Sequence, residues 1–126
     1  MIVIDSSGWL EFFADGLYAD EFAARLRQPA NVITPTIAIY EVYKWIKRER
    51  SEDDAIYAAA TMRKTLVVDL SDEIALTAAD LSLAHKLPMA DAIILATARA
   101  HDAEVLTTDS DFAGVDGVTV FSKKQP

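Results

Sequence analysis

The nine residues that open the chain, Met1-Ile2-Val3-Ile4-Asp5-Ser6-Ser7-Gly8-Trp9, decide how the rest is arranged. An unbroken apolar run that ends at Ile4 is typical of a strand buried on both faces, as in the centre of a parallel sheet. Asp5 then lies at the carboxyl end of that strand, where open α/β sheets place their ligand sites. Its carboxylate either caps the following helix or belongs to such a site.

Further strand and helix patterns alternate along the rest of the chain. Short apolar runs predict strands at 31–34, 65–68, 104–107 and 118–121. Helical spacing predicts helices at about 8–13, 19–28, 36–50, 52–64, 72–86 and 89–101. This alternation predicts the α/β class, as a three-layer α/β/α sandwich around a central, mostly parallel sheet of four to five strands. No linker or repeat divides the chain, so residues 1–126 are expected to form one domain, with a frayed end from Lys123.

Composition excludes several classes of protein. The chain has 126 residues and no cysteine, so disulfides and thiolate metal sites are excluded. No apolar run approaches the roughly 20 residues that span a bilayer. The N-terminus lacks the basic and long apolar regions of a signal peptide. We therefore expect a cytoplasmic protein with no membrane contact.

The formal net charge of −8 argues against non-specific binding of nucleic acid over the whole surface. The basic residues are not spread evenly, however, because four of them cluster within seven positions: Lys44, Lys47, Arg48 and Arg50. Such a run is usually a solvated helix face. The alternative is a basic rim beside an acidic centre.

Four carboxylates stand out by their positions. Asp5 follows the first strand, Asp109 follows the fourth, and Glu41 lies early in the helix after the second. Because parallel strands end at one edge of a sheet, these three are expected to meet there. Asp91 lies in the first turn of a helix that no strand directly precedes, so topology alone does not place it at that edge.

Each of these carboxylates also has a purely structural interpretation. Asp5 could cap a helix, although a neighbouring serine could do so without it. Asp91 could complement the helix dipole, and Asp109 could form an Asx turn. Glu41 could lie at the rim of the core with its charge in water.

The four residues together favour a metal site. Adjacent carboxylates repel one another by a few kcal/mol per pair at an effective dielectric of about 20, which a cation or protonation relieves. A donor set made only of carboxylate oxygens suits Mg²⁺ or Mn²⁺. Such ions also bind phosphate oxygens, which favours metal-assisted hydrolysis of a phosphodiester. Two alternatives remain open: a phosphatase or phosphotransfer protein on a similar fold, and a non-catalytic dimeric module that binds a basic peptide.

The order and spacing of these motifs resemble PIN-domain ribonucleases, and in particular the VapC-type toxins of prokaryotic toxin–antitoxin pairs. The resemblance covers nearly the whole chain. It rests on Ile2-Val3-Ile4-Asp5-Ser6-Ser7, Glu41, Pro88-Met89-Ala90-Asp91-Ala92 and Leu106-Thr107-Thr108-Asp109-Ser110-Asp111-Phe112.

The resemblance implies a metal-dependent endoribonuclease. It implies that one or two Mg²⁺ or Mn²⁺ ions are held by Asp5, Glu41, Asp91 and Asp109, with support from Thr107 and Ser6 and an accessory carboxylate at Asp111. It also implies a homodimer and a small VapB-like antitoxin whose C-terminal segment lies over the acidic site.

The resemblance leaves the RNA-binding surface open. The cluster from Lys44 to Arg50 is the best candidate for phosphate contacts. Tyr40, Tyr43 and Trp45 could stack on bases. Aromatic residues at helical spacing more often belong to a core or a dimer interface, and that interpretation is preferred here.

Overall fold

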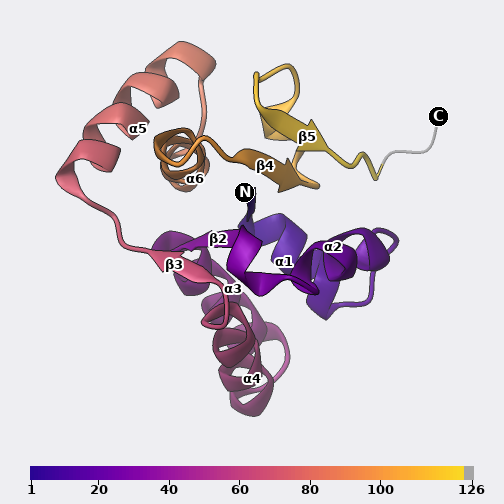
Figure 1. The fold of residues 1–126 in the computed structure, drawn as a ribbon. Coiled ribbons are helices and arrows are strands. Elements are labelled where there is room, and N and C mark those ends of the chain that lie inside the picture. The colour runs from indigo at the N-terminus through magenta and orange to yellow at the C-terminus, as the bar shows by residue number, and fades with distance from the viewer. Residues whose placement is uncertain (124–126) are drawn as a thin grey trace.

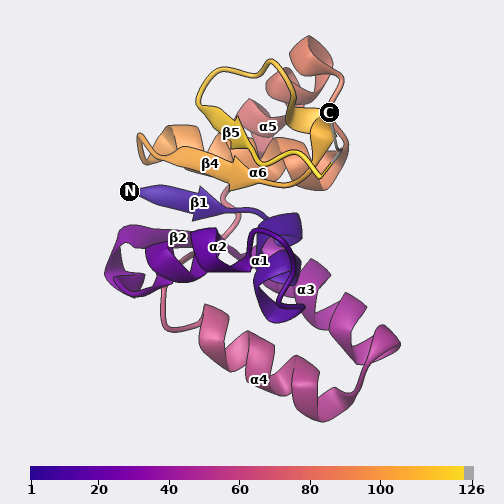
Figure 2. The same cartoon turned by 90° about the vertical axis from the view of Figure 1, so that its right-hand side faces the viewer.

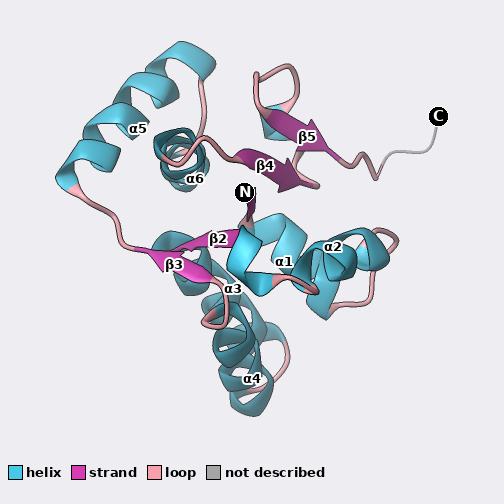
Figure 3. Cartoon of the chain, viewed as in Figure 1, coloured by secondary structure: helices cyan, strands magenta, loops and turns pink. Residues whose placement is uncertain are grey.

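The computed structural model describes residues 1–123 (Figures 1 and 3). Its strands are β1 (Ile2–Ile4), β2 (Val32–Pro35), β3 (Leu66–Val68), β4 (Glu104–Thr107) and β5 (Val118–Val120). Its α-helices are α1 (Ser6–Phe13), α2 (Ala19–Leu26), α3 (Thr36–Glu49), α4 (Glu52–Met62), α5 (Asp72–His85) and α6 (Met89–Ala100). Two short 3₁₀ helices, η1 (Pro29–Asn31) and η2 (Ser110–Phe112), complete the described part of the chain.

The strands form one sheet in the order β3-β2-β1-β4-β5. Every neighbouring pair is parallel, so the predicted sheet is confirmed at the upper end of its strand count. The first strand of the chain is the central one, with β2 on one side and β4 on the other. The carboxyl ends of β1, β2 and β4 therefore lie side by side.

Helices cover both faces of the sheet, as the three-layer prediction requires (Figure 2). Alternate strand residues point to opposite sides, so the sheet contributes to two separate cores. The core under α5 and α6 takes Val3, Ile33 and Val105. The core under α1, α2, α3 and α4 takes Ile4, Val32 and Leu106.

The helix ends follow the sequence closely. Ser51 and Ser71 cap α4 and α5, because their hydroxyls accept hydrogen bonds from Asp54 N (3.0 Å) and Ile74 N (3.1 Å). The apolar helix α6 is buried without a break over residues 92–98, as its composition predicts. Among residues 1–123, no helix is long and apolar enough to cross a membrane.

Helix α1 begins at Ser6, two residues before the predicted start at Gly8. The prediction was wrong because Asp5 itself is the N-cap. Gly8 instead serves packing: a Cβ there would lie 2.8 Å from both Ile4 Cγ2 and the ring of Phe22. Only glycine lets the first turn of α1 lie against β1 and α2 in this way.

Candidate metal centre

Asp5 is fixed at the end of β1 by three donors from the protein. Oδ1 accepts hydrogen bonds from Gly8 N (2.9 Å) and the Ser7 hydroxyl (2.8 Å). Oδ2 accepts one from the Thr107 hydroxyl (2.6 Å). A carboxylate has about four lone-pair sites, so one position on Oδ2 remains for another partner. Asp5 therefore caps α1 through Oδ1 and keeps a position on Oδ2 for another partner, so its role as a cap does not exclude a role in a site.

Thr107, the last residue of β4, connects the ends of β4 and β1. Its hydroxyl donates to Asp5 and accepts from Asp109 N (2.9 Å), and it lies 3.0 Å from the Ser7 hydroxyl. Ser7 also accepts from Thr108 N (3.0 Å). The first turn of α1 and the loop after β4 are thus tied together around the Asp5 carboxylate.

Glu41 lies on α3, and its side chain contacts the first turn of α1. Its Oε1 accepts a hydrogen bond of 2.5 Å from the Ser6 hydroxyl. Ser6 and Glu41 are both partly buried, so this contact fixes the direction of the carboxylate. Helix α3 begins directly after β2, which brings Glu41 to the carboxyl edge of the sheet as predicted.

The closest group of carboxylates consists of Asp91, Asp109 and Asp111. One oxygen of each lies within 4.8 Å of the others, close enough to share a metal ion. Asp109 is the N-cap of η2, where its Oδ1 accepts from Asp111 N (2.9 Å). The Asx-turn interpretation of Asp109 is therefore also correct. Asp111, expected only as an accessory, lies in this group, whereas Glu41 lies outside it.

Burial and mutual repulsion raise the pKa of two of these carboxyls. Burial raises the pKa of Asp5 from its ordinary 3.8 to about 6, against its hydrogen bonds to Thr107, Gly8 and Ser7. Burial also raises the pKa of Asp91 from 3.8 to about 7, with further increases from the charges of Asp109, Asp5 and Glu41. The charges of Asp5, Glu41 and Asp109 thus all act on Asp91, and we call these four carboxylates together with Asp111 the acidic cluster.

This cluster fits a divalent metal ion. All the available ligand atoms are carboxylate oxygens, the donor type that Mg²⁺ and Mn²⁺ prefer. Burial, and for Asp91 also the neighbouring charges, disfavours the ionised forms of these two carboxyls, and the protein's own donors do not offset this, so their pKa values stay raised. No Lys or Arg forms a salt bridge with these carboxylates in residues 1–123. A cation is therefore the partner that the arrangement lacks.

The hydroxyl of Thr107 is expected to support both the fold and metal binding. Thr107→Val removes the hydroxyl that bonds the buried Asp5 Oδ2 and the partly buried Asp109 N. We expect a loss of about 1–3 kcal/mol in the free energy of unfolding. We expect about a 10- to 100-fold loss of Mg²⁺ affinity, as for other residues that orient metal ligands. Urea unfolding and calorimetric Mg²⁺ titration measure the two effects.

The control is Thr107→Ser, which keeps the hydroxyl and should lose little stability or Mg²⁺ affinity. An equal loss in both variants would contradict the role assigned to the Thr107 hydroxyl.

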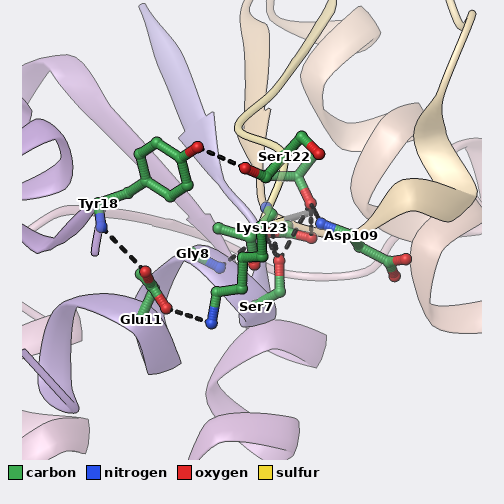
Figure 4. A network of polar contacts seen from close by, with 10 residues as sticks. Ser7, Gly8, Glu11, Tyr18, Asp109, Ser122 and Lys123 are labelled. Atoms are coloured by element: carbon green, nitrogen blue, oxygen red, sulfur yellow. Dashed lines mark hydrogen bonds and ion pairs between the residues drawn. The ribbon is translucent and has the colours of Figure 1, made fainter. Parts of the chain in front are cut away.

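A second polar network fixes the end of the described chain to α1 (Figure 4). Glu11 is buried, and its carboxylate accepts from Lys123 Nζ (2.5 Å) and Tyr18 N (2.9 Å). The Tyr18 hydroxyl donates to the Ser122 carbonyl. Burial raises the pKa of Glu11, but the Lys123 ammonium and the Tyr18 amide lower it by more, so the net pKa falls below 4.5. The prediction of a frayed end from Lys123 was thus wrong at Lys123, and residues 124–126 lie outside the described part.

The predicted basic residues all lie on the exposed side of α3 and at its C-terminus. Lys47 pairs with Glu52 at 3.4 Å, and Arg48 pairs with Glu49 at 2.9 Å.

The aromatic residues of α3 divide into two groups. Tyr43 packs partly into the core, as predicted. Tyr40 and Trp45 are 57% and 39% exposed, so neither belongs to the core, and for these two residues the dimer-interface half of the interpretation stays a prediction.

A carboxylate cluster at the carboxyl edge of a parallel, three-layer α/β sheet defines the class of this protein. The sequence profile described as PIN domain matches residues 2–118. The chain therefore belongs to the PIN domain family, which confirms the resemblance.

Solved structures share the fold over almost the entire chain. A toxin–antitoxin complex from Klebsiella pneumoniae has a TM-score of 0.75 and 28% identity, covering 95% of this chain and 97% of that one. Mycobacterium tuberculosis VapC20, a toxin that cleaves the sarcin–ricin loop, has a TM-score of 0.77 and 22% identity, covering 95% and 98%. Rickettsia felis VapBC2, bound to a promoter DNA fragment, has a TM-score of 0.76 and 13% identity, covering 96% and 98%. No significant match was found among curated protein sequences.

Proposed function

We propose that this PIN-domain protein is a metal-dependent endoribonuclease, the toxin of a toxin–antitoxin pair, with residues 1–126 as one PIN-like domain. The observation that carries the proposal is the group of Asp91, Asp109 and Asp111 beside Asp5 and Glu41. The likeness to the Klebsiella toxin–antitoxin complex and to the RNA-cleaving toxin VapC20 supports the same function.

In this proposal Asp91, Asp109 and Asp111 hold Mg²⁺ or Mn²⁺, with Asp5 and Glu41 completing the acidic cluster. When bound, the ion would activate water and stabilise the negative charge that develops on a phosphodiester. The chain's own contribution is to hold the carboxylates in position. Thr107 and Ser7 orient Asp5, and Ser6 orients Glu41. Such positioning before substrate binds avoids reorganisation during the reaction.

The proposal is tested by cleavage of single-stranded and structured RNA with Mg²⁺, with Mn²⁺ and with a chelator. We expect cleavage in either metal and none in the chelator. Equal cleavage in all conditions, or none in either metal, would contradict the proposal for the RNA used. Turnover of a small phosphomonoester without cleavage of RNA would favour the phosphatase alternative.

The antitoxin is proposed to be a small protein, such as the product of an adjacent reading frame, with a basic segment. The net charge of −8 and the acidic cluster would attract such a segment electrostatically. The test is inhibition of RNA cleavage by the purified product at equimolar concentration.

The expected homodimer is proposed to form through the outer face of α5. Leu76 and Leu83 lie seven residues apart on this helix, on the same side, and are 70% and 84% exposed. Met89, at the start of α6, is 72% exposed as well. Clustered exposed apolar side chains of this kind mark interaction surfaces.

Leu83→Glu is therefore expected to convert the dimer into a monomer. A charge buried in an apolar interface carries a large desolvation penalty, whereas in the monomer Leu83 is solvent-exposed and its replacement is tolerated. Light scattering coupled to size-exclusion chromatography measures the mass. Glu73→Gln, on the same helix but with its charge already exposed, is the control. A wild-type monomer at high concentration, or an unchanged dimer in Leu83→Glu, would contradict this surface.

A further inference from the structure

A hollow with aromatic and basic walls lies next to the acidic cluster, between α1 and α3. Its volume is about 250 Å³. It is lined by Ser6, Leu10, Tyr40, Glu41, Lys44, Trp45 and Arg48. We propose that this aromatic hollow binds a base of single-stranded RNA beside the scissile phosphodiester, by stacking on Tyr40 and Trp45. The proposal rests on the proposed ribonuclease function and names the part of the substrate that this surface recognises.

The aromatic hollow is continuous with the candidate metal centre. Ser6 and Glu41 line the hollow, and their side chains form the 2.5 Å hydrogen bond that orients the Glu41 carboxylate. A phosphate held at the acidic cluster therefore places an adjoining nucleotide at this wall. The volume is below the roughly 300 Å³ of sites for drug-sized ligands, which suits one base rather than a larger ligand.

Two aromatic rings are exposed at this wall without a role in the core. Tyr40 and Trp45 are 57% and 39% exposed, whereas Val42 and Ile46 carry the buried face of α3. Exposed aromatic rings beside basic side chains are the usual platform for single-stranded nucleic acid, because every base has a face that can stack. Helical spacing places Tyr40, Lys44 and Arg48 in one row, four residues apart.

The cations of this row are available to the RNA backbone. Lys44 Nζ lies 5.4 Å from the centre of the Tyr40 ring and 3.3 Å from its hydroxyl. Lys44 forms no salt bridge with any residue of the described chain. Arg48 pairs only with its exposed neighbour Glu49, a type of ion pair that contributes little and exchanges readily. Both cations can therefore neutralise phosphates on either side of a stacked base.

The charge of the hollow favours RNA over a basic peptide. A basic segment attracted to the acidic cluster would be repelled by Lys44 and Arg48 at this wall. The neighbouring cavity, of about 210 Å³, shares Leu10 and Trp45 with the hollow, and its other walls include the oppositely charged Arg50 and Asp54. The aromatic hollow is thus the place where an anionic ligand with a flat ring fits.

The fluorescence of tryptophan tests this proposal directly. The chain has two tryptophans, of which Trp9 is fully buried and Trp45 is exposed. The Asp5→Asn variant is titrated with oligouridylate and oligoadenylate in Mg²⁺. We expect RNA to quench the Trp45 emission, because a base stacks on the indole, and we expect no quenching once Trp45→Phe is added.

Affinity is measured in the same Asp5→Asn background by anisotropy of labelled RNA. Trp45→Ala and Tyr40→Ala should each weaken binding about tenfold, since stacking contributes that order of affinity per base. Trp45→Phe keeps a ring and should retain most of the affinity. The control is Leu17→Ala, which removes another exposed apolar side chain, 70% accessible, that lines neither the hollow nor the neighbouring cavity.

Unchanged RNA affinity in both alanine variants, or unquenched Trp45 at saturating RNA, would overturn the proposal. So would quenching by the product of an adjacent reading frame but not by RNA, which would assign the hollow to a protein. Binding is measured without the Asp5 carboxylate, so its result is independent of whether the wild-type protein cleaves RNA. Failure of the nuclease proposal and failure of this one are thereby distinguished.

Discussion

Asp5→Asn is expected to lower metal-dependent RNA cleavage by roughly a thousandfold and to leave the fold intact. The substitution keeps the shape of the side chain and removes the charge that lies beside Asp91. The remaining carboxylates would still attract a cation, but the site would lack the carboxylate that is fixed most firmly to the central strand. Because the loss concerns charge and not shape, it should appear mainly in kcat.

The fold should survive because asparagine can keep the structural contacts of Asp5. Its Oδ1 accepts from Gly8 N and Ser7 as the aspartate does, and asparagine is an equally good N-cap. Its amide group would face Thr107, whose hydroxyl can then accept from it and donate to Ser7 instead, 3.0 Å away. The hydrogen bonds are rearranged rather than lost.

The measurement is the rate of RNA cleavage at saturating substrate, together with circular dichroism and thermal unfolding. Asp53→Asn, which neutralises an exposed aspartate on α4 away from both the acidic cluster and the proposed dimer surface, is the matched control and should cleave at the wild-type rate. Wild-type activity in Asp5→Asn would exclude Asp5 from the catalytic site. Loss of activity together with loss of the folded spectrum would show that Asp5 acts in folding.

The sequence predicts well those features that depend on local pattern and on parallel topology. The apolar run of Ile2 to Ile4 identifies the central strand, and the polar residues after β1 and β4 then meet because adjacent parallel strands end together. The same logic places Glu41 after β2. Local composition also predicts the burial of α6 and the serine caps of α4 and α5.

What could not be predicted depends on contacts between distant segments. Asp91 reaches the cluster because α6 packs under the sheet after turning back from α5, which no local pattern encodes. Lys123 pairs with Glu11 across the length of the chain, and a charged residue near a terminus gives no sign of such a partner. Trp45 and Tyr40 have the spacing of core residues, but α3 is amphipathic through Val42 and Ile46, which leaves both rings outside.

The role of Ser7 was also missed, for a different reason. Sequence alone offers Ser6 and Ser7 as interchangeable caps of α1. In the structure Ser6 orients Glu41, whereas Ser7 connects Asp5 with the loop after β4. Their functions separate only because adjacent helical residues point about 100° apart, toward different neighbours.

The stability of the metal-free protein is expected to fall as the pH rises from 5 to 7. The pKa of Asp5 is about 6 in the folded protein and 3.8 ordinarily, so the folded state binds more protons than the unfolded state between these values. The free energy of unfolding therefore decreases with pH across that window. Asp91, with a pKa of about 7, acts in the same direction and extends the window upward. The change of pKa at Asp5 alone corresponds to about 3 kcal/mol over the full range.

Metal ions should reverse this loss. A divalent cation binds the ionised cluster, so Mg²⁺ or Mn²⁺ is expected to stabilise the protein most at pH 7 and little at pH 5, where Asp5 and Asp91 are protonated. A concentration of about one hundred times Kd would add about 2.7 kcal/mol. Removal of the metal by a chelator should return the protein to the metal-free curve.

The measurement is urea unfolding at pH 5, 6 and 7, with Mg²⁺ and with a chelator, for wild type and Asp5→Asn. Below pH 5 Glu11 acts in the opposite direction, because its lowered pKa makes its stabilisation disappear as it is protonated, so the comparison stays above that value. Asp5→Asn should be more stable than wild type in the chelator at pH 7, with a shallower dependence on pH. Two results together would contradict this prediction: a metal-free stability that is constant or rises from pH 5 to 7, and no stabilisation by Mg²⁺. They would show that burial and repulsion do not destabilise the ionised carboxylates and that these carboxylates do not bind the ion.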